Sequence, residues 1–188
     1  MDMEKYCRIC KRDTHCCIFE KGGFVFASLK DAKEIKKRIK REYDYFLDYS
    51  ALPIKAVNKL KRCDPALEGR MRYMQLNKNN ILRLKTKEGG RCIFLNDSGR
   101  CRIYSIRPNI CRIFPFWGIR LTDGRIKIIM QDADHKCGAA KSLAGSYEEI
   151  EKALPKHEII KLKKIFKRIE KEADSYKKEI SKLIKENK

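Results

Sequence analysis

The chain has 188 residues, a formal net charge of +20 and nine cysteines. A chain of this length can bury a hydrophobic core, so it does not need cysteine cross-links simply to fold. No stretch has the apolar centre of a signal peptide or approaches the roughly 20 apolar residues of a membrane span. We therefore expect a cytoplasmic protein with no membrane partner. Clustered cysteines in that reducing compartment favour metal ligation.

The composition leaves two alternatives open. The chain is rich in lysine and isoleucine, as hyperthermophile proteins are, and the intracellular proteins of hyperthermophiles can carry disulfides. Disulfides are therefore an alternative to metal. The excess of 45 Lys and Arg over 25 Asp and Glu also favours an acidic partner, such as nucleic acid.

The N-terminal part predicts a cysteine-rich loop followed by a strand and a long helix. The strand is expected at Phe24–Phe26, in a short apolar run after two glycines. Ser28 and Asp31 resemble a capping box, and the apolar residues that follow recur at helical spacing. The sequence therefore predicts a helix over Leu29–Leu47. Pro53 opens a second, weaker helical stretch.

The middle of the chain predicts mixed helix and strand. Short strands are expected at Met71–Leu76, Ile81–Thr86, Cys92–Leu95, Trp117–Leu121 and Arg125–Met130. Asp97–Gly99 predicts a tight turn, and Asp123–Gly124 predicts a two-residue hairpin loop between the last two strands.

The tail predicts a long amphipathic helix. Ser146 and Glu149 form a capping-box pattern, Pro155 interrupts the run, and helical periodicity then continues almost to Lys188. Its apolar stripe consists of Ile159, Leu162, Phe166, Ile169, Ala173, Tyr176, Ile180 and Leu183. Such a stripe packs on its own domain or forms a homodimeric coiled coil.

We therefore predict an α+β fold: a small cysteine-rich metal-binding domain of short strands and helices over residues 1–145, and a helical extension over 146–188.

Eight of the cysteines fall into two groups. The first group is Cys7, Cys10, Cys16 and Cys17, and the second is Cys92, Cys101, Cys111 and Cys137. Sulfur ligands select zinc, copper(I) or iron–sulfur clusters over hard cations. Eight thiolates suit two zinc sites, one 4Fe-4S cluster with supporting cysteines, or two clusters, and spacing alone leaves these open.

Beyond the eight grouped cysteines, two histidines are secondary ligand candidates and one cysteine is set aside. Cys63 stands apart in a basic segment and is interpreted as an ordinary half-buried thiol. His15 and His135 lie next to ligand cysteines in the sequence and could complete a mixed site, although a solvated surface position is an equal alternative.

The second cysteine group carries a resemblance to a known family. The order C-x-F-L, C-x-I-Y-x-x-R-P and C-R-x-F-P, from Cys92 to Pro115, resembles the signature of the CxxCxxCC family of zinc- or iron-chelating domains. The resemblance spans about Cys7 to Gly138 and implies that the eight grouped cysteines are ligands of zinc or an iron–sulfur cluster. Five residues separate Cys10 from Cys16, more than the family name indicates.

Two other function classes remain as alternatives to a metal-binding protein. Related motifs in flagellin lysine methylases imply a cluster-dependent methyltransferase, but no glycine-rich cofactor loop or catalytic constellation is visible in the sequence. A nucleic-acid or ribosome-associated module with structural zinc would use the basic residues of the predicted helix. These are Lys30, Lys33, Lys36, Lys37, Arg38, Lys40 and Arg41.

Overall fold

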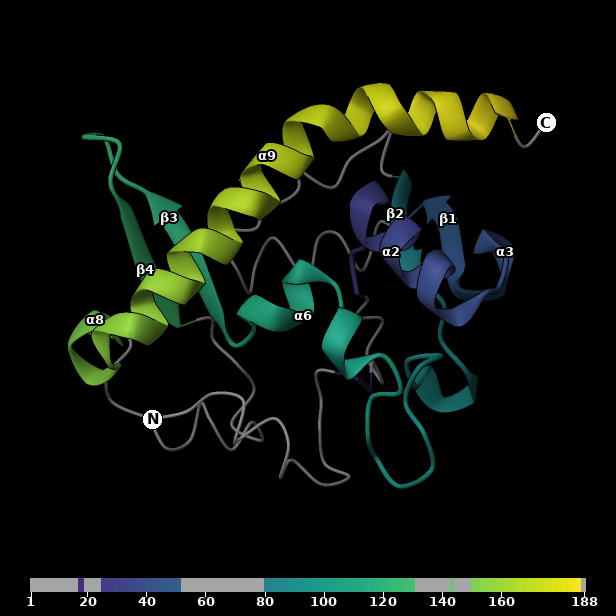
Figure 1. The fold of residues 1–188 in the computed structure, drawn as a ribbon, viewed down its shortest axis with the longest axis horizontal. Helices are drawn as coiled ribbons and strands as arrows, with labels where there is room; N and C mark the ends of the chain where they lie inside the picture. The colour runs from purple at the N-terminus through teal and green to yellow at the C-terminus, as the bar shows by residue number, and fades with distance from the viewer. Residues whose placement is uncertain (1–16, 19–24, 52–79, 131–142, 144–149, 187–188) are drawn as a thin grey trace.

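The computed structural model describes residues 17–18, 25–51, 80–130, 143 and 150–186, with side chains up to residue 172. These residues form short helices, two antiparallel two-stranded sheets and one long C-terminal helix, which is an α+β arrangement. The two sheets lie at opposite ends of the molecule, and the long helix runs across from one end to the other (Figure 1). Each sheet borders its own hydrophobic core, named here the first core and the second core in chain order.

The first sheet pairs β1 (Leu47–Ala51) with β2 (Asn80–Leu84). β2 confirms the strand predicted from Ile81, with bounds shifted by one or two residues. The strand predicted at Phe24–Phe26 is wrong in the residues described, because Phe26 makes only an isolated bridge to Arg83. Backbone hydrogen bonds still hold this segment along the free edge of β2, where the Leu84 N–H donates to the Val25 carbonyl at 2.9 Å.

The predicted capping box is confirmed, but the predicted long helix is wrong. α2 (Leu29–Ile39) begins after Ser28, whose hydroxyl accepts a hydrogen bond from the Asp31 N–H at 3.0 Å. The helix ends because Lys40 adopts a left-handed conformation with φ +52°. A short α3 (Tyr43–Phe46) follows and leads directly into β1. The residues up to Leu47 have helical periodicity, but pairing of β1 with β2 replaces the helix from Leu47 onward. Phe46, the last residue of α3, is fully buried in the first core.

Residues 85–107 contain little regular structure. They include η1 (Glu88–Gly90) and η2 (Tyr104–Ile106). The strand predicted at Cys92–Leu95 is wrong, because Leu95 N–H donates to the Cys92 carbonyl at 2.9 Å and closes a turn. The predicted turn at Asp97–Gly99 is confirmed, with Gly99 at φ +75°. This segment is held by isolated bridges rather than by ladders.

The second sheet is the predicted hairpin of β3 (Phe116–Arg120) and β4 (Ile126–Met130). Its loop is longer than the two residues predicted. The Leu121 N–H donates to the Arg125 carbonyl at 2.8 Å, so three residues lie between the paired positions. Gly124, at φ +81°, supplies the left-handed residue that such a loop requires.

The predicted tail helix is confirmed as α9 (Lys156–Glu186), and the break at Pro155 separates it from α8 (Ile150–Ala153). The first half of the predicted apolar stripe is buried in the second core: Ile159, Leu162, Phe166 and Ile169 are 3–8% exposed. The Phe166 ring packs edge-on against Trp117 of β3, with ring centroids 5.4 Å apart. Gly118 permits this approach, since a Cβ there would overlap the Phe166 ring.

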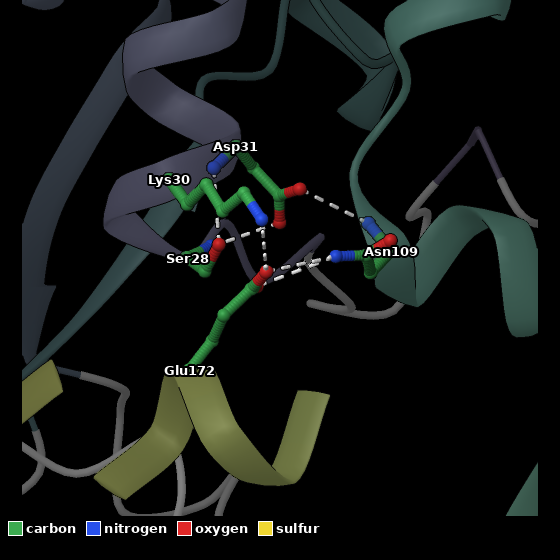
Figure 2. A network of polar contacts seen from close by, with 5 residues as sticks. All are labelled: Ser28, Lys30, Asp31, Asn109 and Glu172. Carbon is green, nitrogen blue, oxygen red and sulfur yellow. Dashed lines mark hydrogen bonds and ion pairs between the residues drawn. The ribbon is translucent and has the colours of Figure 1, made fainter. Parts of the chain in front are cut away.

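A mostly buried polar cluster joins α2, α6 (Asn109–Ile113) and α9, and thereby links the two cores (Figure 2). The Asp31 carboxylate of α2 accepts hydrogen bonds from the N–H groups of Ser28 at 3.2 Å and Asn109 at 3.3 Å. The Asn109 amide also donates to both carboxylate oxygens of Glu172, on α9, at 3.2 and 3.3 Å. Burial, assisted by repulsion from Glu172, raises the pKa of Asp31 to about 6.

Several predictions fall outside the residues described. They are the helix after Pro53, the strand Met71–Leu76, the capping box of Ser146 and Glu149, and the apolar side chains from Ala173 onward. The boundary at residue 145 also stays a prediction. Among the described residues, no helix is both long enough and apolar enough to cross a membrane.

Candidate metal centre

Four of the eight predicted ligands lie in the described part of the chain. They are Cys17, Cys92, Cys101 and Cys111, and each carries a thiol. Cys7, Cys10, Cys16 and Cys137 lie outside the description, as do His15, His135 and Cys63. The site can therefore be built only from one member of the first cysteine group and three members of the second.

A backbone contact joins the first cysteine group to the second. The Cys92 N–H donates to the Cys17 carbonyl at 2.8 Å, and the neighbouring residues Ile18 and Arg91 form an antiparallel bridge. These residues are more than 70 positions apart in the chain. Their pairing brings Cys17, of the first group, and Cys92, of the second, to the same border of the first core.

Cys101 and Cys111 reach that border by different local structures. The turn after Cys92 folds the chain back, so that Cys101 pairs with Leu95 as an isolated bridge. Cys111 lies in α6, where its N–H donates to the Pro108 carbonyl at 2.9 Å. Pro108 is fully buried and fixes the start of this helix.

All four cysteines contact the same core. Cys92 is 5% exposed and belongs to the first core, while Cys17, Cys101 and Cys111 are half-buried against it. Within the residues described, no group of three or more His, Cys, Asp or Glu side chains is arranged to hold a metal ion. The donor type fits zinc or iron, because thiolates prefer these metals, but the described thiols alone do not form a complete site.

Basic side chains brace the loop that carries Cys92 and Cys101. Lys87, Arg91 and Arg102 donate to the carbonyls of Leu95, Asn96 and Ile93, at 3.3, 3.2 and 3.0 Å. These hydrogen bonds replace a regular ladder and hold positive charge beside the cysteines, where it can offset thiolate charge. The sequence did not lead us to predict these contacts from basic side chains to backbone carbonyls. The pairing of arginine with cysteine at Arg91-Cys92 and Cys101-Arg102 was the available signal.

The Arg107-Pro108 pair of the motif lies in a loop that Arg112 closes. Arg112 donates to the carbonyls of Arg107 and Ser105, both at 2.8 Å, and so closes the loop between η2 and α6. The Arg107 guanidinium lies over the Tyr104 ring, 4.1 Å from its centroid. These contacts position α6 and thereby the backbone of Cys111.

The basic residues of α2 are mostly exposed, and Lys30 has an exposed side chain at 71%. Lys36 is an exception, because it pairs with Glu42 and lies over the Tyr43 ring at 4.6 Å. This arrangement also suits a solvated helix face, so nucleic-acid binding by α2 stays a prediction.

Comparison with known proteins supports the metal interpretation. No solved structure matches the chain. The family model CxxCxxCC, described as "Putative zinc- or iron-chelating domain", matches residues 6–138. This match contains all eight grouped cysteines and more than half of the chain, and it ends before α8 and α9. The chain therefore belongs to the CxxCxxCC family.

Proposed function

We propose that this protein binds a zinc ion or an iron–sulfur cluster through the grouped cysteines at the border of the first core. The observation that carries the proposal is the hydrogen bond from the Cys92 N–H to the Cys17 carbonyl, at 2.8 Å. It supports convergence of two cysteine groups that are distant in the chain. The proposed ligands are Cys7, Cys10, Cys16, Cys17, Cys92, Cys101, Cys111 and Cys137.

Burial and charge at this border suit a thiolate site. The first core shields Cys92 from water, and a drier environment strengthens the interaction between a thiolate and a metal. Arg91 and Arg102 hold positive charge nearby. A zinc ion would supply a structural cross-link, whereas an iron–sulfur cluster would supply a one-electron redox centre.

Metal binding would also have a structural role. Cys17, Cys92, Cys101 and Cys111 come from segments that isolated bridges and turns connect. Because the unfolded chain does not hold these thiols together, the free energy of metal binding would add to the free energy of unfolding. The first core would then depend on the metal.

The test is purification without oxygen, followed by elemental analysis and a visible absorption spectrum of the same sample. Iron with acid-labile sulfide and a broad brown absorption would identify a cluster, and stoichiometric zinc in a colourless sample would identify a zinc site. A protein free of both metals would overturn the proposal.

Serine variants locate the ligands. We expect Cys17→Ser, Cys92→Ser, Cys101→Ser and Cys111→Ser each to lower the metal content, because a serine hydroxyl is a poor ligand for these metals. Cys63→Ser is the matched control, since Cys63 is outside the proposed ligand set, and it should keep full metal content. A variant with full metal content and unchanged melting excludes that cysteine as a ligand.

A further inference from the structure

A cavity of about 510 Å³ lies between the η2–α6 loop and the first three turns of α9, on the side of the second core. We call it the basic pocket. None of the four described cysteines lines it, which distinguishes it from the candidate metal centre. Its volume falls within the range of roughly 300–1,000 Å³ that small-molecule sites occupy.

The basic pocket concentrates positive charge. Its permanent cations are Arg107, Arg112, Lys161, Lys164 and Arg168. Its single carboxylate belongs to Glu158, which is buried and lies 3.7 Å from His157 and 3.8 Å from Lys161. Like charges around one cavity repel each other unless an anion enters. The lining therefore selects a ligand with more than one negative charge.

One wall of the pocket is preorganised. Arg112 is fixed by its two hydrogen bonds to backbone carbonyls, and Arg107 is fixed over the Tyr104 ring at 4.1 Å. Arginine pairs with phosphate oxygens through two parallel hydrogen bonds, so a guanidinium held in place suits a phosphate better than a mobile one does.

The opposite wall carries two exposed cations that have no partner among the described residues. Lys164 and Arg168 lie four residues apart on α9, and both are exposed. Residues at this spacing share one face of a helix, so both side chains border the pocket. Within the described residues, neither takes part in a hydrogen bond or an ion pair.

The pocket also has aromatic lining. Tyr104 and Phe114 are half-buried and border the cavity together with the exposed Ile160. Proteins that bind single-stranded nucleic acid combine cations for the phosphates with aromatic side chains on which bases stack. Arg107 covers one face of the Tyr104 ring, so Phe114 is the ring best placed to receive a base. We propose that the basic pocket binds a nucleotide, with its phosphates on the cations and its base on the aromatic lining. The nucleotide is free in solution or at the end of a single-stranded RNA.

The first experiment compares three ligands by calorimetric titration: pyrophosphate, ATP, and an RNA oligonucleotide with a 5′-phosphate. We expect ATP or the RNA to bind about tenfold tighter than pyrophosphate, because pyrophosphate has no base to stack on the aromatic lining. Binding of ATP alone would assign a free nucleotide, and binding of the RNA alone would assign an RNA end. Equal affinity for pyrophosphate and both nucleotides, or no binding at all, would overturn the proposal.

The second experiment locates the binding by charge reversal. Lys164→Glu and Arg168→Glu should each weaken binding by roughly ten- to a hundredfold, because each variant loses a charge-assisted hydrogen bond to a phosphate. Lys167→Glu is the matched control: Lys167 is an exposed cation on the same helix and does not line the pocket. An equal loss in Lys167→Glu would show that only overall charge matters, and it would overturn the site.

The metal content of each variant separates this proposal from the proposed function. Lys164→Glu and Arg168→Glu should keep the metal content of the unmodified protein, because neither is a proposed ligand and both belong to α9, whereas the described cysteines contact the first core. Loss of nucleotide binding with full metal content is the expected result. A protein that lacks metal but still binds the nucleotide would overturn the metal proposal and support the nucleotide-binding proposal.

Discussion

The two hydrophobic cores are built in different ways. The second core lies between a hairpin and the first half of α9, whose ladder and helix satisfy their own backbone groups. The first core is bordered over residues 85–107 by isolated bridges, turns and side chains that donate to carbonyls. The described cysteines all lie at the first core, and none belongs to the second. In the described part of the chain, three of the four cysteines therefore lie in segments with little regular backbone pairing, and the fourth, Cys111, lies in α6.

This difference indicates where each core obtains its stability. The second core relies on close apolar packing, for which large buried rings and branched chains suffice. The first core also buries apolar side chains, but its connecting loop lacks the ladders that would hold it in one conformation. A metal bound by the cysteines would supply that restraint.

Metal removal should have the largest effect and should affect the two cores unequally. We expect a chelator to destabilise the first core by several kcal/mol, because structural zinc binds with roughly 10–16 kcal/mol. Hydrogen exchange measured by mass spectrometry should show lost protection around residues 81–106 and retained protection in β3, β4 and the first half of α9. An equal loss of protection in both cores would contradict the conclusion that only the first core depends on the metal.

Phe166→Ala should have the opposite selectivity: it should destabilise the second core and leave the metal content unchanged. Phe166 is 3% exposed, and removal of a buried phenylalanine side chain costs about 3–5 kcal/mol. Trp117, the sole tryptophan, contacts Phe166 and reports the change as a red-shifted emission. Lys167→Ala, at the exposed neighbouring position, is the control. Loss of metal in Phe166→Ala would contradict the conclusion that the two cores are stabilised separately.

The polar cluster between the cores should depend on pH. Burial raises the pKa of Asp31 from 3.8 to about 6, so the folded protein holds this proton more tightly than the unfolded chain does. Asp31 therefore lowers the free energy of unfolding as pH rises from about 4 through 6.

Comparing the stability of Asp31→Asn with that of the unmodified protein isolates the contribution of the Asp31 carboxyl. Between pH 4.5 and 7, the variant should gain on the order of 2 kcal/mol relative to the unmodified protein, by the linkage between pKa and stability. Urea denaturation at both pH values measures the difference, and other titrating groups cancel because both proteins contain them. A difference that does not change with pH would show that Asp31 keeps its ordinary pKa.

Ser28→Ala should have the smallest effect. It removes the hydroxyl that accepts from the Asp31 N–H at 3.0 Å, and loss of such an N-cap costs about 1 kcal/mol. Ser28→Thr keeps a hydroxyl and should recover most of the stability in the same thermal melt. Because the cap belongs to α2, which borders the first core, we expect metal-bound protein to tolerate the change.

Local signals in the sequence were sufficient for the elements whose cause is local. The capping box at Ser28, the break at Pro155, the glycine turns at Gly99 and Gly124, and the amphipathic α9 were all predicted. The resemblance to the CxxCxxCC family was also visible in the motifs from Cys92 to Pro115, and the family match confirms it.

Long-range pairing decided the rest. The residues from Leu29 to Leu47 have helical periodicity throughout, yet β1 starts at Leu47 because β2 lies beside it. Cys92–Leu95 has the apolar content of a strand, but it makes only isolated bridges at its two ends and closes a turn between them. The contact of Cys17 with Cys92, the polar cluster of Asp31, Asn109 and Glu172, and the basic pocket all join distant segments. By itself the sequence determined residue chemistry and local conformation. Only the tertiary structure decided which of those residues meet, because packing and backbone pairing between distant segments leave no periodic signal in the chain.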